Sequence, residues 1–178
     1  MSSELVPAQP LTSAIQLAGQ AANHAAIRHV FEDYRARRAA NTLIRQRADL
    51  ELFRTYLAAV QAAPAALDFA SDPDAWCGIT WGLVTGFVRW QMQQGYAVSS
   101  INVRLSTVKK YASLAFQAGA IESTEHALIR TVVGYTHKES KQVDEKRSGD
   151  GVQTRIARPG AKKAESVSIP DDIAKSLK

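Results

Sequence analysis

The chain has 178 residues, and 46% of them are apolar, which is enough for one domain with its own hydrophobic core. A single cysteine, Cys77, excludes a disulfide framework and a cysteine-based zinc site. The sequence has neither a run of 18 apolar residues nor the basic, apolar start of a signal peptide, so we expect a cytoplasmic protein without membrane spans. The net charge of +5 suits a polyanionic partner, but solvation alone also accounts for such a charge.

The first 40 residues divide into a tail and a helix. Residues 1–20 contain two prolines and small polar residues, which predicts a flexible tail. From residue 21 to 40 apolar residues recur at spacings of three and four, as on one face of a helix. This stripe consists of Ile27, Val30, Phe31 and Tyr34. Cations near the end suit the negative end of the helix dipole, and they are Arg35, Arg37 and Arg38.

Two further helices are predicted between residues 41 and 94. The second helix covers about 41–63, and a Pro- and Asp-containing surface connection covers 64–78. Thr80 caps a third helix over about 81–94, which ends at Gly95. The residues placed to cap the second helix are Asn41 and Thr42. Its apolar side carries Leu43, Leu50, Phe53, Leu57 and Val60.

A fourth helix is predicted up to Gln117, with Ser99 or Ser100 as its cap and Gly119 as its stop. On a helical wheel, one narrow apolar stripe faces the core. The stripe consists of Ile101, Leu105, Val108, Ala112 and Ala115. Almost opposite lie Ser99, Ser106 and Lys110, and the flanks carry Asn102, Val103 and Thr107.

A fifth helix is predicted over about 123–135, and after it the apolar pattern stops. Residues 137–167 are charged and poor in apolar residues, which predicts a basic linker between domains. Residues 168–178 predict the start of another helix, because Ser168 can cap it and Pro170 fits its first turn. A helix this short is marginal on its own in water, so we expect a second domain to follow.

The order of these motifs resembles the core-binding domain of tyrosine recombinases and phage integrases. One matching run is NTLIRQRADLELFRTYL, with Thr42, Asp49, Leu50 and Phe53 at the family's positions. The other run is GLVTGFVRWQMQQGYAVSSINVRLSTVKKYASLAFQAG, which supplies Gly95, Ser100, Ile101, Asn102, Arg104, Leu105 and Gly119. Each motif is weak by itself, and their order and spacing carry the resemblance over roughly residues 22–178.

The resemblance implies an all-α protein, an orthogonal bundle of four to five helices with the SAM-like fold of integrase N-terminal domains. Residues 21–136 would form this domain, and residues 168–178 would begin a truncated catalytic domain. The implied function is that of the DNA-binding module of a site-specific recombinase, which clamps one half-site of duplex DNA for strand exchange. The family also implies self-association of protomers on DNA, and it implies no metal or cofactor.

Carried over by position, the DNA-contacting set lies at the starts of the second and fourth helices. It consists of Asn41, Thr42, Arg45, Ser99, Ser100, Arg104, Thr107 and Lys110. Helix amino termini attract phosphate oxygens, and arginine can fork onto a guanine edge. The competing interpretation is that the arginines are solvated and the hydroxyls act as helix caps. Val103 departs from the pattern, because it offers no hydrogen bond.

Catalysis is not expected from this chain. In the family, a tyrosine attacks the phosphodiester, assisted by arginines, a lysine and histidines of the catalytic domain. No such constellation surrounds the tyrosines, which are Tyr34, Tyr56, Tyr96, Tyr111 and Tyr135. Two alternatives to a recombinase module remain, a stand-alone helical DNA-binding regulator and a helical protein-interaction module.

Overall fold

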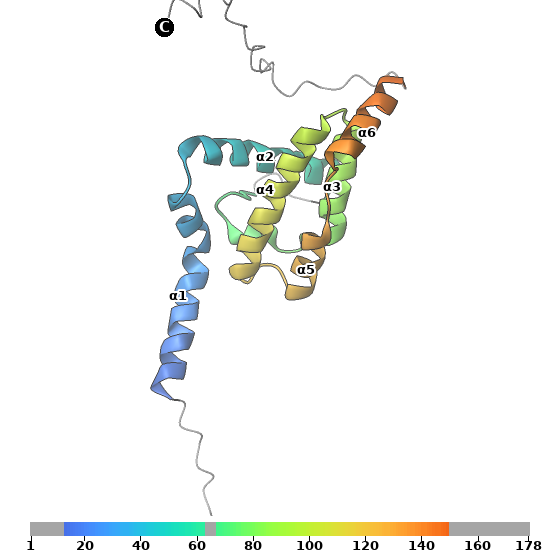
Figure 1. Ribbon diagram of the computed structural model, residues 1–178. Helices are drawn as coiled ribbons and strands as arrows, with labels where there is room; N and C mark the ends of the chain where they lie inside the picture. Colours follow the sequence, from blue (N-terminus) through green and yellow to red (C-terminus); the bar gives the residue numbers. More distant parts are fainter. Residues whose placement is uncertain (1–12, 63–66, 150–178) are drawn as a thin grey trace, which may run out of the picture.

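The computed structural model describes residues 13–62 and 67–149, and every regular element in these ranges is helical, which confirms the all-α prediction for this part of the chain (Figure 1). It contains one short 3-10 helix, η1 (Pro73–Trp76), where the sequence predicts only a surface connection. The α-helices are α1 (Ala14–Ala36), α2 (Ala40–Ala59), α3 (Trp81–Gln93), α4 (Val98–Gln117), α5 (Ser123–Thr131) and α6 (His137–Gly149). The helix start predicted at residues 168–178 lies outside the described residues.

Helix α4 forms the centre of the fold. It packs against all the other helices, and Figure 1 shows it crossing α2. All five residues of the predicted stripe, from Ile101 to Ala115, are buried. Because neighbours surround α4 on several sides, Thr107, Tyr111 and Leu114 are buried as well. The buried face is therefore wider than one amphipathic stripe.

Aromatic side chains fill the space between α2, η1 and α3. Phe53 of α2 is fully buried, with its ring centroid 5.1 Å from that of Phe87 and 6.0 Å from that of Trp76. The indole N–H of Trp76 donates a 3.0 Å hydrogen bond to the carbonyl of Phe69. Aromatic ring pairs such as Phe53–Phe87 add about 0.5–1.5 kcal/mol each to stability, beyond the contribution of the apolar area that they bury. They fix α2 against the rest of the bundle.

The helix ends follow the predicted stops but not all the predicted caps. Gly95 and Gly119 have φ of 76° and 81°, the left-handed region in which glycine ends a helix, and the Thr80 hydroxyl accepts a bond from the N–H of Leu83. In contrast, α2 and α4 begin after Ala39 and Ala97, which have no side chain to cap them. The capping roles expected of Asn41, Thr42, Ser99 and Ser100 are therefore wrong.

Helix α1 begins at Ala14 rather than near residue 21, so residues 14–20 are helical and not part of a tail. A capping box explains this start, because the Ser13 hydroxyl accepts from the N–H of Gln16 and the Gln16 side chain accepts from the N–H of Ser13. Only Phe31 and Tyr34, near the end of α1, are buried in the core. The rest of the helix extends away from the bundle (Figure 1).

Residues 137–149 form helix α6, where the sequence predicts a linker. Thr136 and Glu139 form a second capping box at its start. The guanidinium of Arg147, which is buried, donates a 2.9 Å hydrogen bond to the carbonyl of Tyr96 and another to the carbonyl of Met92. Since these carbonyls lie in the last turn of α3 and in the turn that follows it, Arg147 attaches α6 to this part of the bundle. Helix α5 ends earlier than predicted, at Thr131.

Candidate nucleic-acid interface

The eight residues predicted to contact DNA lie on α2 and α4, and seven of them reach the surface. Three are exposed, namely Asn41, Ser99 and Lys110. Four are partly buried, namely Thr42, Arg45, Ser100 and Arg104. Thr107 is only 2% exposed, because it lies on the side of α4 that faces α2. We therefore assign Thr107 to the support beneath this surface rather than to the surface itself.

A buried carboxylate, Asp49, joins the two helices where they cross. Its Oδ2 accepts a 3.0 Å bond from the guanidinium of Arg45 and a 2.8 Å bond from the hydroxyl of Thr107. Asp49 itself is 7% exposed. The charge of Asp49 also acts on the more distant Arg104. The carboxylate therefore lies among three of the predicted residues.

Arg104 is held on the other side of this junction by α3 and the turn that follows it. Its guanidinium lies 4.3 Å from the centre of the Tyr96 ring and donates a 3.3 Å bond to Oε1 of the fully buried Gln91. Burial lowers the pKa of Arg104, while Tyr96 and Asp49 raise it. Sequence reasoning missed both Gln91 and Tyr96, since only the tertiary fold brings them to α4.

Lys110 lies over another aromatic ring, that of Tyr34 at the end of α1. Its Nζ is 5.0 Å from the ring centre, and the guanidinium of Arg38 is 4.8 Å from the same centre. The Tyr34 hydroxyl accepts a 2.8 Å bond from the side chain of Gln46, which fixes the ring. Arg38 therefore belongs to this surface, although its position in the sequence suggests only a helix-dipole role. The spacing of four between Tyr34 and Arg38 is a signal that could have identified it.

These contacts bring together four cations, each beside an aromatic ring or a hydrogen-bond acceptor, on a surface that we call the α2–α4 face. The four cations are Arg38, Arg45, Arg104 and Lys110. Helix α4 contributes no carboxylate. No side chain caps the first turns of α2 and α4, so none of their backbone N–H groups is bonded to a capping side chain. Such an arrangement can bind a chain of phosphates and present arginine forks to base edges.

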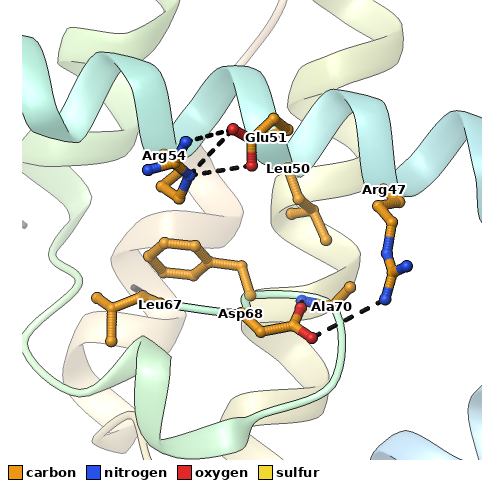
Figure 2. Close-up of a pocket in the computed structure, with 8 residues that line it drawn as sticks. Arg47, Leu50, Glu51, Arg54, Leu67, Asp68 and Ala70 are labelled. Carbon is orange, nitrogen blue, oxygen red and sulfur yellow. Dashed lines mark hydrogen bonds and ion pairs between the residues drawn. The ribbon is translucent and has the colours of Figure 1, made fainter. Parts of the chain in front are cut away.

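A separate pocket of about 230 Å³ lies on the opposite side of α2, against the loop over residues 67–70 (Figure 2). Two ion pairs border it, Glu51 with Arg54 and Arg47 with Asp68, the latter at 3.9 Å. The charges of the pocket therefore compensate one another, unlike those of the α2–α4 face. Within the described residues, no His, Cys, Asp and Glu side chains are grouped as metal ligands.

The described tyrosines serve packing and hydrogen bonding in this structure. Burial raises the pKa of Tyr56 and of Tyr111, so both rings favour the protonated phenol. Tyr135 pairs with α4 through its backbone, since the Asn102 side chain donates a 2.6 Å bond to its carbonyl and accepts a 2.9 Å bond from its N–H. Among residues 13–62 and 67–149, no helix is long and apolar enough to cross a bilayer.

Comparison with protein-family models, curated proteins and solved structures returns no match to this chain. The family resemblance therefore stands on the motifs alone, and the α2–α4 face stands on its own geometry.

Proposed function

We propose that this chain binds duplex DNA through the α2–α4 face. The observation that carries the proposal is the gathering of four cations, from the α1–α2 connection, α2 and α4, each of which contacts an aromatic ring or a buried acceptor. A solvated charge needs no such support. Aromatic rings and buried acceptors reduce the side-chain freedom that binding would otherwise remove.

We further propose that the chain is the DNA-binding module of a tyrosine recombinase of the phage-integrase type, with the SAM-like fold. In this proposal the first turns of α2 and α4 meet backbone phosphates, and Arg45 and Arg104 reach base edges in the major groove. The module would hold one half-site for strand exchange, with the strand chemistry carried out by a catalytic domain of the parent protein. Protomers would associate on the DNA.

Binding of a labelled duplex at several salt concentrations tests the first proposal. If four cations neutralise four phosphates, the slope of log K against log salt should be about −3 to −4. Affinity should then fall on the order of 10²-fold between ~50 and ~200 mM salt. An affinity that does not weaken with salt would rule out a phosphate-binding face.

Single substitutions locate the binding to the α2–α4 face. Lys110→Ala should weaken binding to all duplexes and reduce the salt slope by about 1, because one phosphate contact is lost. The matched control is Arg28→Ala, since Arg28 is exposed on the part of α1 that extends away from the bundle (Figure 1). Equal losses of affinity for both variants would mean that Lys110 does not contact the DNA and that the losses follow only from the lower net charge.

One observation favours a second candidate, a protein-interaction module. The extending part of α1 exposes Ile15, which is 81% exposed, and Leu17. Light scattering of the chain without DNA tests this candidate. Association that Ile15→Ser abolishes would support it, and a monomer at all concentrations would speak against self-association through α1.

A further inference from the structure

Asp49 places a negative charge beneath the α2–α4 face, although we propose that this face binds phosphates. Its negative charge lies 3.0 Å from the guanidinium of Arg45 and, against the larger lowering by burial, raises the pKa of Arg104, so it opposes the approach of a polyanion to these cations. A neutral acceptor would be enough to join α2 to α4 through the Thr107 hydroxyl. That hydroxyl also has a second acceptor, the carbonyl of Val103 at 3.3 Å, so it does not require a carboxylate. The charge therefore calls for an account of its own.

The geometry of Arg45 supplies that account. One of its terminal nitrogens is held by Asp49, one helical turn further along α2, and the Arg45 side chain is 35% exposed. A guanidinium carries five N–H donors in a planar fork, so a hydrogen bond to Asp49 restricts the orientation of the donors that remain. A carboxylate that is itself held by Thr107 from α4 can fix this orientation relative to both helices.

We propose that Asp49 is a positioning residue that fixes the direction in which Arg45 meets the base pairs, and that it thereby sets sequence preference at that position. This inference rests on the proposed DNA binding. Asp49 reduces general attraction to the phosphates and increases discrimination between sequences. Asp49→Ala should therefore bind random duplexes as tightly as the unaltered chain or more tightly, and discriminate less.

The chain offers a matched control on the same helix. Glu51 also pairs with an arginine of α2, Arg54, but it borders the pocket on the other side of α2 (Figure 2). Asp49→Ala and Glu51→Ala raise the net charge equally and each removes one arginine partner. Only the first variant releases Arg45. Asp49→Glu keeps a carboxylate within reach of Arg45 and serves as the rescue.

The experiment is selection from a duplex library with a randomised centre, using the full 178-residue chain and its three variants. Selected and random duplexes are then compared by titration at one salt concentration. We expect Asp49→Ala to lose preference at one or two neighbouring base pairs. The ratio of selected to random affinity should fall about tenfold, since one well-placed arginine fork is worth roughly that discrimination. Glu51→Ala should keep the ratio, and Asp49→Glu should restore most of it.

Equal ratios for Asp49→Ala and Glu51→Ala would overturn the inference, as would a wild-type chain that binds duplexes but enriches no sequence. If the wild-type chain shows no salt-dependent binding at all, the proposed function fails and the inference fails with it. Circular dichroism verifies that each variant folds. If Asp49→Ala does not fold, Asp49→Asn replaces it. That variant retains an acceptor for Thr107 and loses the charge that holds Arg45, so the same comparison of ratios applies.

Discussion

Gly134 is expected to contribute to stability because of one neighbour, the side chain of Asn102. A Cβ at residue 134 would overlap Oδ1 of Asn102 and lie 3.0 Å from its Cγ. The backbone of Gly134 is outside the left-handed region, so alanine is not strained there. Gly134→Ala should therefore act by displacing the Asn102 side chain from the backbone of Tyr135.

The magnitude follows from the two hydrogen bonds that join Asn102 to Tyr135, at 2.6 and 2.9 Å. At about 0.5–1.5 kcal/mol each, their loss should lower the free energy of unfolding by about 2 kcal/mol. For a chain of this size, the melting temperature should fall by about 4–8 °C. Asn102→Ala should lower stability by a similar amount, since it removes the same two bonds.

The double variant decides whether this reasoning is right. Without Asn102 the added methyl has nothing to displace, and replacing glycine by alanine restricts the unfolded chain, which stabilises by about 0.4–1 kcal/mol. Gly134→Ala should thus change from destabilising to neutral or stabilising in the Asn102→Ala background. Urea unfolding followed by tryptophan fluorescence measures all four chains. Additive losses would refute the argument, because they would mean that the two residues act independently.

Two further outcomes are expected. Burial, and to a lesser extent the charge of Arg130, lower the pKa of His126 in the folded chain. The contribution of His126 to the free energy of unfolding should therefore be fully present above about pH 6.5 and be lost as the pH drops through the folded pKa. His126→Phe retains a ring that can stack on Phe116, as His126 does at 4.4 Å between ring centroids. This variant should reduce the change of the urea midpoint between pH 7 and 5, and an unchanged dependence on pH would contradict the argument. Arg147→Ala should expose α6 amides to hydrogen exchange and lower the free energy of unfolding by about 2 kcal/mol. The control Lys146→Ala should do neither, because Lys146 is exposed. Continued protection of α6 amides in Arg147→Ala would show that other contacts hold the helix.

Much of the fold could be predicted because its signals are local. The spacing of apolar residues identifies the face that α4 buries, and glycine's tolerance of positive φ places two helix stops at Gly95 and Gly119. Helix α2 begins before Asn41 because Ala40 is a strong helix former. Helix α4 begins before Ser99 with Val98, whose side chain is buried by tertiary packing that the local sequence does not reveal.

Helix α6 was missed because the sequence over residues 137–149 has no apolar stripe to reveal it. Its signals are the Thr136–Glu139 capping box and one long-range anchor, Arg147. The box is visible in the sequence, but the anchor depends on carbonyls in the last turn of α3 and in the turn that follows it. A polar helix held by long-range contacts, such as those of Arg147 and of α6 with α4, lies beyond what periodicity can predict.

The candidate site divides in the same way. The order of motifs predicts a site on α2 and α4, and the structure brings Arg45 and Thr107 of these two helices together around Asp49. The burial of Thr107 does not follow from the motifs, because the flank of an apolar stripe is buried or exposed according to how many neighbours a helix has. The aromatic supports under Arg104 and Lys110 come from Tyr96 and Tyr34, which are distant in sequence. Only the fold brings these rings and cations together.

The absence of side-chain caps on α2 and α4 bears on any attempt to stabilise this protein. Serine in place of Ala39 or Ala97 would accept from a first-turn N–H and stabilise each helix by about 1 kcal/mol. The same serine would occupy an amide that a phosphate could otherwise bind. Selection for heat resistance alone would therefore enrich substitutions at residues 39 and 97 that compete with an anionic ligand. If these turns bind phosphate as proposed, thermal stability and ligand affinity place opposite demands on the amino-terminal turns of α2 and α4.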